Sequence, residues 1–164
     1  QPVHSIHARI QQQTANLEAL AKRLPTGDIR RGQAVFNSAK TQCIACHNIG
    51  YVGGKIGPDL TRIGSIRNER DLLESIIYPS ASFVRSYEPV SVKTTDGKVF
   101  NGVPKKDSPE EMILVLAADK EVRIDRKDIE EVTPGKVSIM PAGLNQQITE
   151  QDLADLIAFL KDRK

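Results

Sequence analysis

The sequence predicts a mainly α fold with a small antiparallel β unit, which is inserted between the third helix and a loop that precedes the last helix. Two observations support this fold class. Toward both ends of the 164-residue chain, apolar residues recur three or four positions apart, as they do along one face of a helix. Over about residues 83–135, apolar and polar residues alternate instead, which is typical of strands.

Four segments have the pattern of helices. The first covers about residues 1–24, and Pro25 ends it because proline cannot continue a helix. The second begins at Asp28, whose carboxylate is a favourable N-cap. The third runs from about residue 68 to residue 78. The last begins after Thr149, in a capping sequence, and has the clearest apolar stripe of the four.

The middle of the chain contains two predicted β-hairpins. Asp96-Gly97 lies between two runs of alternating valines, and this dipeptide favours the tight turn of a hairpin. A second pair of apolar runs, at residues 113–116 and 122–124, is separated by a turn near Asp119-Lys120. We therefore expect a small antiparallel sheet whose pairings are local in sequence.

Composition limits the classes of function. The formal net charge of +2 is too small to indicate a nucleic-acid-binding protein. The longest apolar runs, at residues 113–118 and 153–160, are too short to span a bilayer. Hydrophobic residues make up 39% of the chain and aromatic residues only 4%, so a large apolar cofactor would help to complete the core. Because the sequence starts with Gln1-Pro2, we expect a removed upstream segment or a larger parent protein.

The strongest motif is Cys43-Ile44-Ala45-Cys46-His47, which contains both cysteines of the chain. This C-x-x-C-H pattern is the attachment sequence of c-type haem. Each thiol adds to one vinyl group of the haem, and the three-residue step lets both sulfurs reach neighbouring edges of the same ring. The adjoining imidazole is then directed toward the iron. The motif therefore predicts one covalently attached haem c, with His47 as the proximal ligand.

Three other interpretations explain the motif less well. A zinc site needs about four ligands, and outside the motif only His4 and His7 offer imidazoles. A thioredoxin-like dithiol would follow a strand, whereas this motif follows a helix and precedes a glycine-rich irregular loop. A structural disulfide between the two cysteines would leave His47 without a role.

The second axial ligand is predicted to be Met140. Only Met112 and Met140 offer thioethers. Met112 is expected at the edge of a strand, where it would pack in the core or lie at the surface. Met140 lies in a loop that Pro141 stiffens, and a His/Met pair is the axial ligation known in cytochromes c. The remaining candidates, His4 and His7, are expected to be exposed to solvent on the first helix.

Residues after the motif have predicted supporting roles. Pro58 could pack against the His47 ring, and its carbonyl could accept the ring N–H and so fix the imidazole. Lys55 and Arg62 could contact the haem propionates, although an ordinary surface role explains these two residues equally well.

The order of these motifs resembles that of class I cytochromes c: a helix, C-x-x-C-H, Gly-Pro-Asp-Leu, a late methionine and a C-terminal helix. Longer segments extend the resemblance, at residues 53–64, 72–80 and 138–141. Together with Tyr87-Glu88 and the Asp96-Gly97 hairpin, they look like the haem-binding domain that is common in planctomycete and verrucomicrobial proteins. In those proteins the domain often forms the C-terminal part of a larger chain.

The resemblance covers about residues 28–162 and implies a class I cytochrome c-like helical fold with a β insertion. It implies a cytochrome c domain at residues 27–164, interrupted by the insertion at residues 83–135, while residues 1–26 form an N-terminal helix or linker. It also implies a periplasmic or otherwise exported location, because c-type haem is attached there.

The functional residues of the family carry over to four positions. Haem attachment falls on Cys43 and Cys46, and axial ligation falls on His47 and Met140. We expect an electron carrier without catalytic residues, which passes single electrons from a dehydrogenase, docked or fused upstream, to another redox protein. The alternative is a haem-based sensor or a peroxidase-like enzyme with an exchangeable sixth ligand. A third hypothesis treats the β unit as an interaction module. The oligomeric state stays open.

Overall fold

The computed structural model describes residues 2–164, with side chains from residue 5 onward, and the chain divides into two compact units. We call the first the helical unit; it comprises Gln1–Thr41, Arg62–Ile77 and Gly143–Lys164. We call the second the sheet unit; it comprises Gln42–Thr61 and Tyr78–Ala142. Each unit therefore joins segments that are far apart in the sequence.

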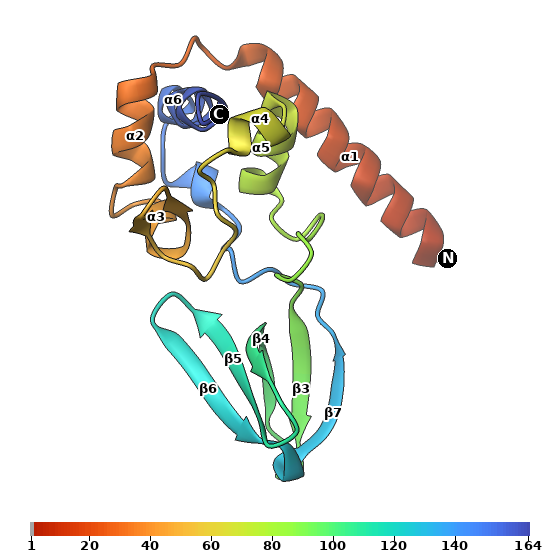
Figure 1. Cartoon of the computed structure of the whole chain (residues 1–164). Helices are drawn as coiled ribbons and strands as arrows, with labels where there is room; N and C mark the ends of the chain where they lie inside the picture. Colours follow the sequence, from red (N-terminus) through yellow and green to blue (C-terminus); the bar gives the residue numbers. More distant parts are fainter. Residues whose placement is uncertain (1) are drawn as a thin grey trace. The chain divides into compact units, whose positions relative to one another are not determined.

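The helical unit is built around its last helix, α6 (Glu150–Lys161). Its other elements are α1 (Pro2–Arg23), α2 (Ile29–Phe36), α4 (Ile63–Ile66), α5 (Glu69–Ile77) and the 3-10 turn η2 (Leu144–Gln146). Helices α2, α4 and α5 contact α6, and α1 packs against α5 (Figure 1). The approach of α2 to α6 is close, because a Cβ atom at Gly32 would lie only 1.9 Å from the Asp155 carbonyl oxygen.

The four predicted helices are confirmed as α1, α2, α5 and α6. Their capping signals also act as expected. The Asp28 carboxylate accepts a hydrogen bond from the Arg31 N–H at 2.9 Å, and Thr149 forms a reciprocal capping box with Asp152. The sequence does not indicate α4, because a helix of four residues is too short to show an apolar period. None of the helices in the described residues is long and apolar enough to cross a membrane.

A buried carboxylate ties the start of α2 to α6. The Asp155 side chain is only 1% exposed. One of its oxygens accepts the Asp28 N–H at 2.7 Å, and the Arg31 guanidinium donates to the other oxygen at 2.7 Å. The Gln151 amide adds a further donor at 2.9 Å. The hydrogen bond from Arg31 is the main cause that lowers the pKa of Asp155, and burial opposes it.

Acid should weaken this link. Because the pKa of Asp155 is held below its usual value of 3.8, the ionised carboxylate stabilises the fold above that value. This contribution is lost as the pH falls through the folded pKa. We expect Asp155→Asn to lower the free energy of unfolding by about 1–3 kcal/mol at neutral pH. The difference from the native protein should shrink in acid, as urea denaturation at several pH values would measure.

The matched control is Asp162→Asn, at the end of the same helix. Its ion pair with Arg163 is much more exposed, so its loss should cost less than about 1 kcal/mol. A stability difference between native and Asp155→Asn proteins that stays constant into the acid range would contradict the assignment.

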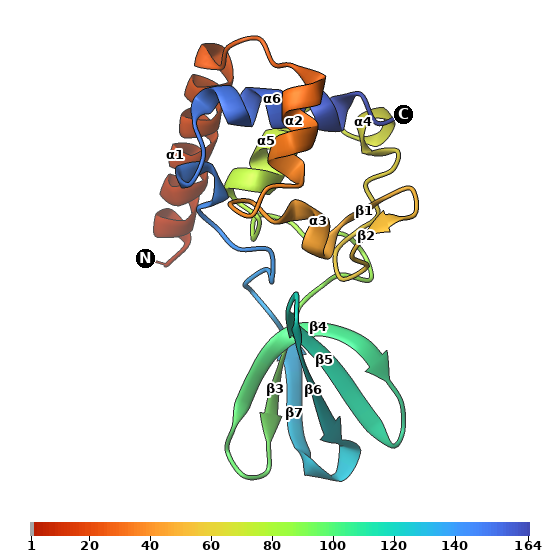
Figure 2. The same cartoon turned by 90° about the vertical axis from the view of Figure 1, so that its left-hand side faces the viewer.

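The sheet unit contains a five-stranded antiparallel sheet with the strand order β6-β5-β4-β3-β7, which can be followed in Figure 1. Figure 2 shows the same strands turned by 90°. The strands are β3 (Val90–Thr94), β4 (Val99–Asp107), β5 (Glu111–Ala117), β6 (Lys120–Asp125) and β7 (Ile129–Pro134). A 3-10 turn, η1 (Arg126–Asp128), connects β6 to β7. The buried core of the sheet consists of Val92, Met112, Leu114 and Ile124. The sheet therefore has a hydrophobic interior of its own.

Both predicted hairpins are confirmed. Strands β3 and β4 meet at Asp96-Gly97, where Gly97 takes a left-handed φ of +83° that few other residues adopt. Strands β5 and β6 are joined by the turn before Lys120. The sequence does not indicate β7, because its residues after Ile129 are exposed and show no apolar alternation. Its pairing with β3 is long-range, with Pro134 opposite Val90.

The prediction of a mainly α fold is wrong. Helices account for 39% of the residues and strands for 23%, so the fold is mixed α/β. The two hairpins do not form a minor insertion, because β7 extends them to a five-stranded sheet with its own core. A further short hairpin, β1 (Asn48–Ile49) with β2 (Val52–Gly53), lies in the glycine-rich loop that was expected to be irregular.

Candidate functional site

The C-x-x-C-H motif forms the short helix α3 (Cys43–Cys46) in the sheet unit. Cys43 and Cys46 are three positions apart, so their side chains lie on the same face of the helix. Both are partly buried, and no disulfide joins these two residues. Burial raises the pKa of the Cys46 thiol. His47 leaves the helix in an extended conformation, so the motif presents two neighbouring thiols followed directly by an imidazole.

The His47 ring is held in one orientation. Its Nδ1 atom lies 2.7 Å from the carbonyl oxygen of Pro58, which can only accept, so Nδ1 is the donor. Burial lowers the pKa of His47 and the hydrogen bond to Pro58 raises it by less, which keeps the ring neutral at neutral pH. In a neutral ring with a proton on Nδ1, the lone pair is on Nε2. The predicted hydrogen bond from His47 to Pro58 is thus confirmed, and it leaves Nε2 able to ligate a metal.

Glycines let the following loop fold back on the motif. The Gly54 N–H donates to the Ile44 carbonyl, and the Gly57 N–H donates to the Cys46 carbonyl, both at 2.8 Å. Gly57 also lies against the imidazole, since a Cβ atom there would come within 2.6 Å of His47 Cε1. A side chain at Gly57 would therefore displace the ring. The loop acts as a frame around α3 and His47.

A polar network behind this loop was not evident from the sequence. The Asp59 carboxylate accepts the Thr61 N–H at 2.8 Å, and the Thr61 hydroxyl oxygen accepts the Gly50 N–H at 2.7 Å. The Asn48 amide donates to the Gly50 carbonyl at 3.1 Å. Hydrogen bonds from Thr61 are the main cause that lowers the pKa of Asp59. The Asp-x-Thr spacing is a signal for this kind of turn, and it holds the β1–β2 hairpin against the segment after Pro58.

Met140 lies in the loop between β7 and η2, in the same unit as the motif but on a separate segment. Its side chain is partly buried, and its backbone N–H donates to the Ser138 hydroxyl at 3.1 Å. The Ser138 N–H in turn donates to the Ser80 hydroxyl at 2.9 Å, which anchors the loop to the chain after α5. Met140 is thus on an ordered loop that two serines restrain. Its assignment as an axial ligand stays a prediction.

The other candidates are distributed as follows. Met112 is only 2% exposed and packs in the core of the sheet, which agrees with a packing role. His7 is exposed on α1, as expected, whereas the side chain of His4 lies outside the described residues. Lys55 and Arg62 are both exposed, Lys55 within the loop that frames the motif and Arg62 at the start of α4. Their contact with haem propionates stays a prediction.

Comparison with known proteins does not assign the chain. No model of a protein family matches it, and no curated protein matches it either. The interpretation of the site therefore depends on its own chemistry.

The donor set fits a covalently bound haem better than it fits a bare metal ion. Two thiols share one helix face, and the adjoining imidazole has its distal nitrogen available because Nδ1 is bonded to Pro58. Across the side chains that the structure describes, no group of three or more His, Cys, Asp and Glu residues gathers at one place. A zinc site of the usual four ligands has no counterpart in that part of the chain.

Proposed function

We propose that this chain is an electron-transfer protein with one covalent haem c. Cys43 and Cys46 would carry the two thioether links, and His47 and Met140 would be the axial ligands. The observation that carries the proposal is the hydrogen bond from His47 Nδ1 to the Pro58 carbonyl, beside a helix that presents both thiols. This hydrogen bond prepares the imidazole to ligate iron before any cofactor is bound.

The bound haem would supply a one-electron couple between ferrous and ferric iron. The residues of the chain would attach, orient and shield it. The Pro58 carbonyl keeps the proton on Nδ1 and so leaves the lone pair on Nε2, and Gly57 gives the ring room. Burial lowers the pKa of His47, so the imidazole is not lost to protonation at neutral pH. Met140 would donate a soft thioether, which favours the ferrous state.

We further propose an exported, periplasmic location and redox proteins as partners. The donor would be a dehydrogenase, either docked to this chain or fused to it. The proposed carrier role needs a sixth ligand that stays bound. A haem-based sensor or peroxidase-like enzyme would instead need an exchangeable position, and carbon monoxide binding by the native ferrous protein would favour that alternative.

The attachment chemistry can be tested with three variants. The native chain, produced in cells that possess c-type haem maturation, should carry one haem that survives denaturation. Cys43→Ser and Cys46→Ser should each keep a single thioether link, and the double variant should keep none. The pyridine haemochrome spectrum and the mass of the denatured protein measure the number of links. Denatured native protein that has lost its haem would refute the proposal.

A further inference from the structure

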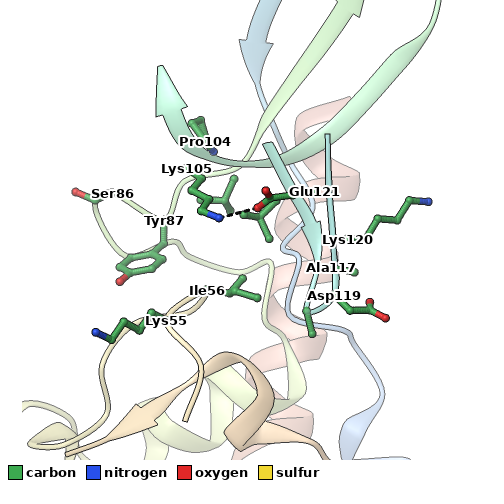
Figure 3. Close-up of a pocket in the computed structure, with 13 residues that line it drawn as sticks. Lys55, Ile56, Ser86, Tyr87, Pro104, Lys105, Ala117, Asp119, Lys120 and Glu121 are labelled. Carbon is green, nitrogen blue, oxygen red and sulfur yellow. Dashed lines mark hydrogen bonds and ion pairs between the residues drawn. The ribbon is translucent and has the colours of Figure 1, made fainter. Parts of the chain in front are cut away.

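A cavity of about 600 Å³ opens in the sheet unit (Figure 3). Its size lies within the range of small-molecule sites. None of Cys43, Cys46, His47 and Met140 lines it. The lining comes instead from strands β4, β5 and β6, the turn between β5 and β6, the Ser86-Tyr87 segment and the Lys55-Ile56 segment of the loop that frames the motif. The lining of the cavity is therefore distinct from the set of proposed haem ligands.

The floor of the cavity is apolar. Val103 of β4 and Val115 of β5 are directly opposite each other on neighbouring strands, and their exposed fractions are 7% and 8%. Ile56 and Ala117 extend this apolar lining. Figure 3 shows Ile56 between the Tyr87 ring and the sheet. Such a floor favours a ligand with an apolar body, because burying that body removes apolar area from water.

The backbone is irregular at three points around the cavity. The pairing of β4 with β5 shifts at Lys105, and the pairing of β5 with β6 shifts between Val115 and Ala117. Ser86 takes a left-handed φ of +73°, which is costly for a residue other than glycine. Bulges redirect side chains and are common next to binding sites, and strained residues also gather there. Their coincidence at one cavity indicates a built site.

The charges of the lining select the ligand. The lining includes three lysines, at positions 55, 105 and 120, and two carboxylates, Asp119 and Glu121. One of these, Glu121, is engaged by the Lys105 ammonium at 2.7 Å. Because Lys105 and Glu121 neutralise each other, Lys55 and Lys120 remain against Asp119, and this excess of one positive charge favours an anion. The Tyr87 ring offers a surface on which an aromatic body can stack. We propose that this cavity binds a small aromatic anion. The occupant contacts the Lys55-Ile56 segment, whose neighbours Gly54 and Gly57 are hydrogen-bonded to α3.

The test uses anthraquinone-2-sulfonate as the probe, titrated calorimetrically into the purified full chain. Ala117→Trp fills the cavity and should weaken binding roughly tenfold or more. Lys55→Glu reverses one charge and should weaken it roughly fivefold, with a smaller dependence on salt. The matched controls are Val99→Trp, on an exposed part of β4, and Lys127→Glu, both outside the lining. Neither control should change the affinity.

Amide shifts in a nitrogen–proton NMR spectrum locate the probe. The largest shifts should fall on Ile56, Tyr87 and Ala117. If about 1 mM probe produces neither binding heat nor amide shifts, the proposal is overturned. A dissociation constant weaker than this would not indicate a specific site. Equal binding to Ala117→Trp and Val99→Trp would also overturn it, because the probe would then lie elsewhere. Neither measurement needs a bound haem, so the outcome is independent of the proposed function.

Discussion

Met140→Ala should open the sixth coordination position of the proposed haem. The ferric protein should change from low spin to a high-spin or water-ligated spectrum, and the ferrous protein should bind carbon monoxide. The reduction potential should fall by on the order of 0.1 V, because a soft thioether that favours ferrous iron is lost. The free energy of unfolding should fall only slightly, since the Met140 side chain is only partly buried. Visible spectra and a redox titration measure these effects.

Met112→Ala is the matched control, because it removes the other thioether of the chain. Met112 is 2% exposed and packs with Leu114 and Ile124 in the core of the sheet. Its truncation leaves a cavity and should lower the free energy of unfolding by about 2–5 kcal/mol. The haem spectrum should stay unchanged. If Met112→Ala, and not Met140→Ala, abolishes low-spin ligation, the assignment of the axial ligand is wrong. If neither variant does, an imidazole from His4 or His7 becomes the candidate.

Removal of the five-stranded sheet should leave the haem attached. The ends of the sheet are adjacent, because the Gly135 N–H donates to the Pro89 carbonyl at 2.8 Å. Residues 90–134 can therefore be replaced by two glycines without stretching the chain. The motif, its framing loop and Met140 all lie outside the deletion, so covalent haem and a low-spin spectrum should persist. Strand circular dichroism should be lost almost entirely, and binding of anthraquinone-2-sulfonate should disappear with the cavity.

Met140→Ala in the shortened protein supplies the control for this deletion. It should again convert the spectrum to high spin, which shows that the same ligand is used with and without the sheet. A shortened protein that folds, with normal helical circular dichroism, but lacks the native ferric spectrum would show that the sheet shapes the haem pocket. The predicted separation of the β insertion from haem binding would then be wrong.

Local chemistry in the sequence is sufficient for most elements. The helix boundaries follow from Asp28 and Thr149 because a cap acts on amides within three residues of itself. The first hairpin follows from Asp96-Gly97, since a turn dipeptide specifies its own backbone conformation. The C-x-x-C-H motif likewise contains its proposed chemistry within five consecutive residues. Each of these signals needs no knowledge of distant contacts.

The prediction of the fold class was wrong because the decisive contact, the pairing of β7 with β3, joins residues far apart in the sequence. Strand β7 has an exposed, irregular sequence, and it becomes a strand only because β3 offers an unpaired edge. Without that pairing, the two hairpins look like a small addition to a helical protein. The Asp155 contact with the start of α2 is similar, because nothing in the final helix indicates which cation its buried carboxylate meets.

At the proposed haem site, the sequence and the tertiary structure contribute different information. The sequence by itself predicted which residues would attach and ligate a haem, because those residue types and their spacing are set by the chemistry of the cofactor. The sequence also predicted the hydrogen bond from His47 to the Pro58 carbonyl, which the structure confirms. Only the tertiary structure decided that Ser80 restrains the loop of Met140 and that Met112 lies in the core of the sheet. It also created the cavity, whose lining combines Lys55-Ile56 with residues of the distant strands β4, β5 and β6. These contacts join residues that are separated in sequence, and only the packing of the folded chain brings them together.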